Sequence, residues 1–424
     1  MTLEPVGEAG MRITLSPSKP DVISLVEILD SKTGRCVRTL HAGPVAAKQI
    51  LTLNKATRLK PGSYRMRYRE DINLVPDAAL KFPGKERWVN PVDLALTEKS
   101  VFVLDSGLIL KEAVPEQDGK PAEEAVTKGQ TCVYKFNRDL SPDIKFGDRG
   151  RLIISESPSY YRSIAADESG LVYHPNGRQV EVWDGSGDSP LYRIGGMDPA
   201  WAPDHYTAKG RNTQEVGGVA LGAGPKIYLG ILAHFTLRAY NRTQKDFDGF
   251  LYSVSAREGL TGDQDRCIAS DGESSVYFAD RAGQIRKIED TGKELKISYA
   301  SELEHKICHA MGASASANLV CVAAHGPGDG AFWDSGGGSE VVFLWDNGSS
   351  LQLVARFGSP VETAGQLQFM NPSAAIMSAD HTELWVSEDG QKNEEGPPGN
   401  ARVSRLKITC SKSEEIPFGW KTAK

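Results

Sequence analysis

The residues best suited to chemistry in this chain stand at one repeated position. Arg162 in YYRSIAAD, Arg266 in DRCIASD and His309 in CHAMGAS each lead into a short apolar segment. Arginine binds carboxylate, sulfate or phosphate through paired hydrogen bonds, and a neutral imidazole exchanges protons near pH 7. These residues predict a site for an anionic ligand, with His309 or Tyr161 as the proton acceptor. The alternative is that each arginine pairs with a neighbouring carboxylate such as Asp280 and only joins parts of the fold.

Aromatic and amide side chains near these positions could line the same site. Rings cover the apolar faces of sugars while polar groups bind sugar hydroxyls, so this mixture favours a carbohydrate ligand. The alternative is that the rings pack inside the fold. The predicted substrate-binding residues are Tyr160, Asn90, Asn371, Trp201, Tyr206 and Trp333.

Metal binding is a further hypothesis for the same site. Three histidines would match the ligand preference of zinc, and carboxylates from several repeats would suit calcium. Their alternative uses are as turn residues and as salt-bridge partners. The sequence has no GxSxG, HExxH, Walker-loop or EF-hand motif, which argues against those enzyme classes. The predicted zinc ligands are His174, His309 and His325, and the predicted calcium ligands are Asp105, Asp280 and Glu388.

Six related segments must position these residues. Each consists of an apolar strand, a turn of Asp, Ser or Gly, a second strand, another turn and a third strand that ends near Asp or Asn; residues 265–290 show this most clearly. An all-strand repeat of this length predicts a β-propeller with one antiparallel sheet per repeat. Strand direction alternates in such a sheet, so first-strand entries and second-to-third connections share a face. The candidate residues should therefore ring one mouth of the central channel.

Long insertions are expected at that same mouth. Residues 106–130, 326–340 and 389–400 fall between second and third strands, and residues 196–215 fall between two repeats. Long loops on one face of a rigid scaffold commonly carry binding and catalytic groups. The alternative is that they are tolerated surface additions.

The chain is expected to divide into a β-sandwich at residues 1–70, a propeller at 71–412 and a C-terminal tail at 413–424. Apolar and polar residues alternate between Gly and Pro turns near the N-terminus, which predicts the sandwich. The sixth repeat ends near Thr409 without a fourth strand, and the isolated segment AALKFPGK at 78–85 is expected to supply it. This closure removes exposed sheet edges. The predicted fold is all-β: a six-bladed propeller, closed by an N-terminal strand and preceded by a small sandwich.

Two family resemblances accompany these patterns. VEILDSKTGRCVRTLHAG followed by LKPGSYRMRYR, with the turn at Pro61, Gly62 and Tyr64, resembles the immunoglobulin-like domain of the flagellar hook-capping protein and its bacterial extracellular relatives. That resemblance implies a spacer module. NPVDLAL…VFVLDSG and NPSAAIM…ELWVSEDG resemble the NHL repeat family, whereas the Gly-His of WD40 blades is missing.

The resemblance to the NHL repeat family also affects the prediction of a zinc site. The related peptidyl-hydroxyglycine lyases bind zinc through histidines at the strand-entry position of several blades. Here only the fifth repeat has a histidine there, His309, while the second and fourth repeats have arginine. This departure from the family pattern weakens the zinc hypothesis.

Composition restricts partners and location. The net charge of -6 and the lack of a basic run argue against nucleic acid as a partner. The six cysteines form no CxxC pair, and no apolar stretch of about 18 residues predicts a membrane span. The beginning MTLEPVGEAG lacks the features of a signal peptide, so either the protein is cytoplasmic or its signal peptide is not part of this sequence. The expected location is extracellular or periplasmic.

These observations predict an extracellular or periplasmic propeller that binds an anionic small molecule or an acidic polysaccharide at its insertion-bearing mouth. If the protein is an enzyme, it is expected to be a polysaccharide lyase or hydrolase, assisted by zinc or calcium if a metal takes part. In β-elimination, Arg162 and Arg266 would neutralise a uronate carboxylate. The alternative is a non-catalytic module that recognises a protein or a cell-surface partner.

Overall fold

The structure is a computed structural model in which β-strands form the framework. Among the described residues it contains one short helical turn, the 3₁₀ helix η3 (Phe247–Gly249), and no helix long and apolar enough to cross a membrane. The described residues are 1–6, 10–45, 48–54, 57, 59–81, 88–117, 120–159, 161–196, 215–231, 236–254, 267–279, 285–300, 310–324, 340–358, 367–369, 371–388 and 401–421.

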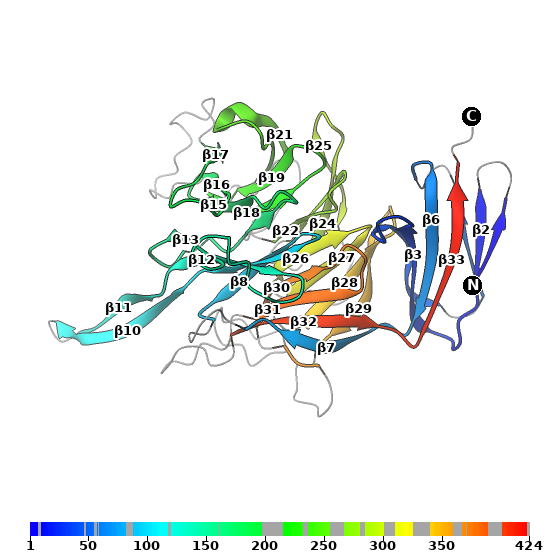
Figure 1. Cartoon of the computed structure of the whole chain (residues 1–424), viewed down its shortest axis with the longest axis horizontal. Helices are drawn as coiled ribbons and strands as arrows, with labels where there is room; N and C mark the ends of the chain where they lie inside the picture. The colour runs from blue at the N-terminus through cyan, green and yellow to red at the C-terminus, as the bar shows by residue number, and fades with distance from the viewer. Residues whose placement is uncertain are drawn as a thin grey trace.

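Six four-stranded antiparallel sheets form the larger part of the structure (Figure 1). The first strands are β8 (Pro91–Leu96), β14 (Ala165–Ala166), β18 (Val216–Leu221), β22 (Ile268–Ser270), β26 (Ala310–Ser316) and β30 (Pro372–Met377). The second strands are β9 (Ser100–Asp105), β15 (Val172–Asn176), β19 (Lys226–Ile231), β23 (Ser275–Ala279), β27 (Leu319–Ala324) and β31 (Glu383–Glu388). The third strands are β12 (Thr131–Asn137), β16 (Gln179–Trp183), β20 (Thr236–Asn241), β24 (Ile285–Asp290), β28 (Glu340–Asp346) and β32 (Arg402–Thr409). The fourth strands are β13 (Arg151–Ser155), β17 (Tyr192–Gly195), β21 (Phe250–Val254), β25 (Leu295–Ala300), β29 (Leu351–Phe357) and β7 (Asn73–Ala79).

The first strands form a closed ring, so the fold is a β-propeller. Each first strand contacts the first strands of the two neighbouring sheets, and β30 contacts β8. Small residues permit this close approach. A Cβ atom on Gly312 would lie only 2.7 Å from the carbonyl oxygen of Ser373 in the next first strand. Glycine is therefore required where β26 passes β30.

The sixth sheet takes its fourth strand from the N-terminal part of the chain, as the sequence predicted. That strand is β7, and it pairs with β32 from Asn73 opposite Thr409 to Ala79 opposite Ser404. It therefore begins five residues before the predicted segment at 78–85, of which residues 82–85 lie outside the described residues. Pairing the two ends of the ring leaves no open edge between the first and last sheets.

The aspartates that end the repeats join neighbouring sheets. Asp290 at the end of β24 accepts hydrogen bonds from Tyr228 Oη and Lys226 Nζ of the preceding sheet, both at 2.7 Å. Asp346 at the end of β28 lies 2.8 Å from Lys287 Nζ of its own preceding sheet. Asp290 and Asp346 thus have a structural role, because each of them stabilises its sheet against the preceding one.

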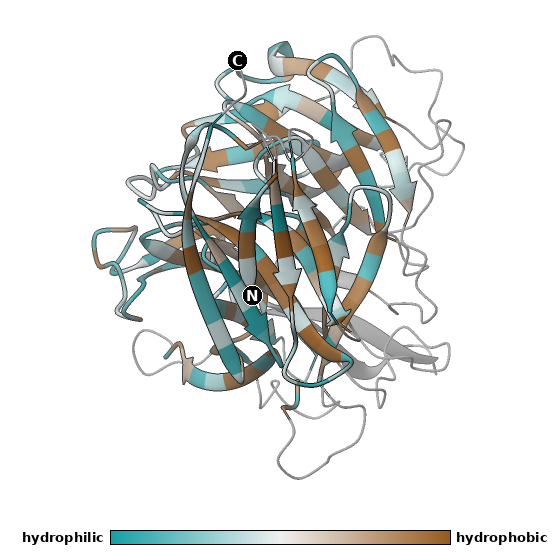
Figure 2. Cartoon of the chain, turned by 90° about the vertical axis from the view of Figure 1, so that its right-hand side faces the viewer, coloured by the Kyte–Doolittle hydropathy of each residue, from teal (hydrophilic) through white to brown (hydrophobic). Residues whose placement is uncertain are grey.

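The N-terminal unit, as we call the part outside the ring, consists of two sheets. One contains β1 (Thr2–Pro5), β2 (Met11–Leu15) and β5 (Gln49–Leu53); the other contains β33 (Lys412–Trp420), β6 (Gly62–Glu70), β3 (Val22–Asp30) and β4 (Cys36–Val45). Buried side chains from both sheets form one core, and apolar and polar residues alternate along the strands (Figure 2). In the larger sheet the second face is also buried along β3 and β6, and it carries Glu27 and Arg69.

The expected C-terminal tail is instead a strand of the N-terminal unit. β33 pairs with β6 from Lys412 opposite Glu70 to Trp420 opposite Gly62, and Trp420 is buried in the core of the unit. Ile416 and Phe418 alternate with exposed residues along the strand. The expectation failed because β33 is only nine residues long and its partner stands more than three hundred residues away in sequence.

The N-terminal unit packs against the propeller face that carries the turns between first and second strands. The backbone N–H of Cys36 donates to Ala379 O at 2.7 Å, and that of Thr39 donates to Ala317 O at 2.8 Å. Trp345 Nε1 donates to Thr39 O at 3.2 Å. Backbone hydrogen bonds along β4 therefore hold the unit to the fifth and sixth sheets.

One predicted insertion is a long hairpin on the first sheet. It contains β10 (Leu108–Gln117) and β11 (Lys120–Lys128) and extends away from the ring between β9 and β12 (Figure 1). The other three insertions, at 196–215, 326–340 and 389–400, lie almost entirely outside the described residues. Their common placement at one mouth stays a prediction.

We expect Asp346→Ala to lower the free energy of unfolding by about 3 kcal/mol, because Lys287 and Tyr277 would remain buried without their acceptor. Urea unfolding followed by tyrosine fluorescence measures this change. Asp188→Ala, at an exposed turn, is the matched control and should change the value by less than about 0.5 kcal/mol. Equal effects of the two substitutions would contradict the structural role of Asp346.

Deleting residues 411–424 should expose the core of the N-terminal unit, because β6 loses its β33 neighbour and Trp420 leaves the core. We expect cleavage of residues 1–70 by a protease to become at least about tenfold faster, while the propeller stays resistant. Mass spectrometry of the fragments measures both rates. Deletion of residues 422–424 alone is the control, and equal rates in the two deletions would show that β33 does not stabilise the unit.

Candidate functional site

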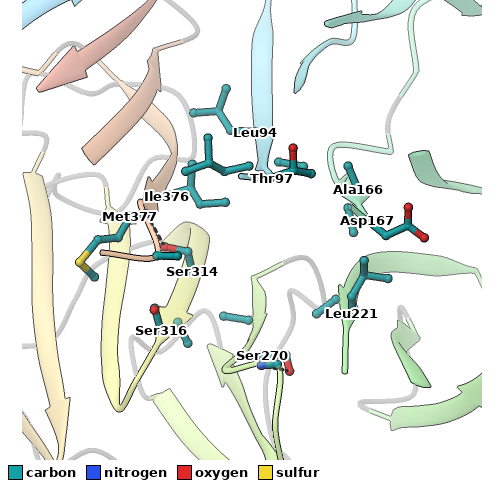
Figure 3. A pocket seen from close by; sticks show the side chains of 18 of the residues that line it. Leu94, Thr97, Ala166, Asp167, Leu221, Ser270, Ser314, Ser316, Ile376 and Met377 are labelled. Carbon is teal, nitrogen blue, oxygen red and sulfur yellow. Dashed lines mark hydrogen bonds between the residues drawn. The ribbon is translucent and has the colours of Figure 1, made fainter. Parts of the chain in front are cut away.

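The central channel of the propeller contains a cavity of about 980 Å³. Side chains from the first strands surround it (Figure 3). About half of the lining residues are apolar or glycine and the others are polar or charged, so the wall offers both apolar surface and hydrogen-bonding groups. Representative wall residues are Leu94, Ala166, Leu221, Ser314 and Ile376.

The cavity opens at the face that carries the turns between first and second strands. Its rim includes Glu98, Glu168 and Asp271, each of which stands in such a turn. We had expected the site at the opposite mouth, where first strands begin. Among the described residues, the cavity instead reaches the face against which the N-terminal unit packs.

The N-terminal unit contributes to this mouth. Thr33 and Arg35, in the turn between β3 and β4, line the cavity together with the propeller residues. Arg35 Nη1 lies 3.3 Å from Glu98 Oε1, and both side chains are about half exposed, so the pair stabilises the contact only weakly. A molecule entering the channel would therefore meet both parts of the protein.

Carboxylates outnumber guanidinium groups among the described residues that line the cavity. The lining contains six acidic residues and four arginines. Asp167 is paired with Arg242 at 3.0 Å. Glu168 and Asp271 accept hydrogen bonds only from backbone N–H groups in the described structure, so their charges are not neutralised by an ion pair there. This mouth attracts cations rather than anions.

Asp93 is the acidic residue at the deep end of the cavity, and our sequence-based predictions did not include it. The backbone N–H groups of Ile164 and Leu94 donate to its carboxylate at 2.7 and 2.8 Å. Burial raises the pKa of Asp93 to about 7, although these hydrogen bonds and the nearby Arg162 oppose the rise. An acid within the apolar segment NPVDLAL is the feature that could have identified it.

Two of the predicted catalytic residues lie among the described residues. Arg162 lines the cavity, and its charge acts on Asp93. Tyr161 precedes it, and the backbone N–H of Tyr161 donates to Ser159 Oγ at 3.0 Å. The structure therefore places an acid and a guanidinium together at the inner end of the channel, an arrangement that can bind a polar group of a ligand.

The predicted substrate-binding amides occupy strand entries. Asn90 Nδ2 donates to Ser106 Oγ at 3.0 Å and to Gly107 O at 2.9 Å, which joins the start of β8 to the end of β9. Asn371 directly precedes β30 with a φ of 57°, a left-handed conformation that asparagine tolerates. Asn90 confirms that first-strand entries and second-strand exits share a face, and its own contacts are structural.

The proposed metal ligands are only partly described. His174 is buried in β15, where its Nδ1 lies 3.1 Å from Ser163 O. Burial lowers the pKa of His174 to about 4, against the effect of this hydrogen bond, so the ring is neutral near pH 7. The predicted site residues outside the described part are Tyr160, Trp201, Tyr206, Arg266, His309, His325 and Trp333.

The carboxylates considered for calcium have other partners. Asp105 accepts hydrogen bonds from the backbone N–H groups of Val89 and Asn90, both at 2.9 Å. Glu388 pairs with Arg402 at 2.5 Å, and Asp280 lies outside the described residues. The salt-bridge alternative is confirmed for Glu388, whereas Asp105 binds backbone N–H groups instead.

Asp93 yields a pH-dependent prediction. Its pKa is about 7 in the fold and near 3.8 in an unfolded chain, so its ionisation costs stability as the pH rises through this range. Asp93→Asn should therefore be about 1–3 kcal/mol more stable than the natural protein at pH 8, with little difference at pH 4. Urea unfolding at both pH values measures the difference. A constant difference between them would exclude a titrating Asp93.

Comparisons with known proteins show a likeness of fold. No family model matches the chain, and no curated protein matches its sequence. A solved structure of U3-55K is 13% identical with a TM-score of 0.41, and the alignment covers 80% of this chain and 98% of that one. The WD40 repeats of RRP9 are 12% identical with a TM-score of 0.43, covering 80% and 99%. The WD40 propeller domain of Doa1 is 11% identical with a TM-score of 0.43, covering 79% and 96%. The fold assignment rests on the strand pairings described above.

Proposed function

We propose that this protein is a non-catalytic binding scaffold whose channel holds a cationic segment of a partner protein. The observation that carries this proposal is the cavity of about 980 Å³, whose lining combines apolar residues with more carboxylates than guanidinium groups. A lysine or arginine side chain suits both features. Its hydrocarbon stem packs on apolar surface while its charged end pairs with carboxylates.

The positions of the acidic groups support a segment that enters from the rim. Glu168 and Asp271 offer carboxylates at the entrance, and Asp93 offers one at the inner end. Apolar residues on the wall between them, such as Leu94 and Ile376, would pack against the stem of an inserted side chain. Thr33 and Arg35 of the N-terminal unit border the same entrance and would contact the remainder of the segment.

The finer assignments of the fold belong to the same proposal. We assign the ring to six NHL-like blades and the N-terminal unit to an immunoglobulin-like spacer, on the sequence resemblances given above. An extracellular or periplasmic location follows from the bacterial relatives of that spacer. Fractionation of cells that express this protein, with detection of the protein in each fraction, tests this location.

The second candidate is an acidic polysaccharide, bound or cleaved by a lyase or hydrolase with zinc or calcium. Arg162 on the channel wall is the observation that favours it. Its other main residues, Arg266 and His309, lie outside the described residues. The surplus of carboxylates around the described cavity opposes an anionic ligand, so the cationic segment is the leading proposal.

A binding assay separates the two candidates. We would measure fluorescence polarisation with 12-residue peptides in which Lys, Glu or Ser alternates with Ala and Leu, and with labelled oligogalacturonate. We expect the Lys peptide to bind best, with an affinity that falls as salt rises. The double substitution Glu168→Lys and Asp271→Lys should weaken this binding at least about tenfold, because each change reverses a charge at the rim.

The control is Asp188→Lys, which reverses an exposed charge outside the cavity lining and should leave affinity unchanged. Equal binding of the three peptides would contradict the cationic-segment proposal. Binding of oligogalacturonate that Arg162→Ala abolishes would favour the polysaccharide candidate instead.

A further inference from the structure

A buried charged cluster joins the N-terminal unit to the sixth sheet. Glu27 on β3 is fully buried, and its carboxylate accepts hydrogen bonds from Arg67 Nε at 2.9 Å and Arg69 Nη2 at 2.9 Å. His381, which is also fully buried, donates from Nδ1 to Glu27 Oε1 at 2.8 Å. One carboxylate of the N-terminal unit thus binds groups from both parts of the protein.

The turn that carries His381 also forms part of the channel rim. Ser378, Ala379 and Asp380 line the cavity, and His381 follows them with a φ of 54°. This left-handed conformation is strained for a non-glycine residue, so surrounding contacts must hold it. We call residues 378–382 the rim turn.

Both arginines of the cluster hold the backbone of this rim turn. Arg67 Nη2 donates to Asp380 O at 2.6 Å, and Arg69 Nη1 donates to His381 O at 2.9 Å. The backbone N–H of Cys36 donates to Ala379 O at 2.7 Å. The geometry of one side of the channel mouth therefore depends on the contact with the N-terminal unit.

The charges in this cluster favour a protonated His381 over a bound metal ion. Potential ligand atoms of Glu27, Cys36 and His381 lie within 4.8 Å of one another. However, the Glu27 oxygens already accept hydrogen bonds from two guanidinium groups and the imidazole, and a metal cation would stand beside two permanent positive charges. A proton on Nε2 of His381 adds only a single positive charge, on a ring whose Nδ1 lies 2.8 Å from the carboxylate.

The titratable and charged groups around His381 come from each neighbouring element. They are Glu27 on β3, the Cys36 thiol on β4, Arg67 and Arg69 on β6, and the adjacent Asp380, whose carboxylate accepts from Ser378 and Thr382. Burial by itself would lower the pKa of His381, but Cys36 and Glu27 outweigh burial and raise the pKa to about 9. The imidazole is therefore protonated near neutral pH.

We propose that the proton on His381 is a latch that holds the rim turn against the N-terminal unit, and that its loss in alkaline solution releases this turn. Without the proton, Nδ1 can still donate to Glu27, but the imidazole carries no charge to balance the carboxylate in its buried site. The proposal does not depend on which ligand the channel binds.

The sign of the pH effect follows from linkage. A histidine whose pKa is higher in the folded state than in the unfolded chain stabilises the fold below its unfolded value of about 6.5. That contribution is lost as the pH rises through about 9. The contact between the two parts should therefore weaken between these pH values.

Hydrogen exchange with mass spectrometry tests the latch in the full chain. Protection of segments 36–45 and 372–383, corrected for intrinsic exchange, should fall at least about tenfold between pH 7 and pH 9.5. Segment 268–279 in the fourth sheet is the internal control and should not change. His381→Gln should show weak protection of the first two segments already at pH 7 and no further fall with pH.

A second variant keeps the test valid if His381→Gln does not fold. Cys36→Ser removes the thiol beside His381 and should move the midpoint of the pH effect to a lower value. Constant protection across pH in the natural protein, or the same fall in His381→Gln, would overturn the proposal. So would added Zn²⁺ that increases protection in the natural protein but not in Cys36→Ser, because it would assign the cluster to a metal.

Discussion

Two crossings of the chain between the N-terminal unit and the propeller constrain the rest of this structure. β6 belongs to the unit, and after Asp71 and Ile72 the chain enters the propeller as β7, the last strand of the ring. At the other end, β32 completes its sheet and only two residues lead to β33 beside β6. These two short connections hold the unit beside the sixth sheet, because the strands that they join, β6 with β7 and β32 with β33, belong one to each part.

This shared construction explains where the channel opens and what surrounds it. The unit packs on the face of the first-to-second turns, so its β3–β4 turn borders the cavity there. The buried pairs of Glu27 with Arg67 and Arg69 fix β3 and β6 against the rim turn. Because removing one partner of a buried ion pair leaves an unpaired charge, these contacts specify a single arrangement of unit and propeller. Binding at the channel mouth would thus involve both parts of the chain.

Much of the fold was predictable because its information is local. Alternating strands and turn residues recur in the repeats, and Asp290 and Asp346, which end two of them, both join their sheet to the preceding one. The closing strand was predictable because the sixth repeat lacked a fourth strand. The pairing of β33 was not predictable, because a segment of nine alternating residues could pair with the edge of many strands. Its actual partner also lies far away in sequence. Among candidate site residues, Arg162 was placed on the channel, whereas Asp93 was overlooked within an apolar strand.

The amino-acid sequence by itself determined the all-β class, the repeat and the return of an N-terminal strand to the last sheet, since hydrophobic periodicity and turn chemistry act over a few residues. Only the tertiary structure decided which mouth of the channel is hollowed, which charges surround it and how His381 meets Glu27. The reason is physical: burial and electrostatic pairing depend on distances between residues such as Glu27 and His381, which stand more than three hundred positions apart. No local pattern specifies such a distance.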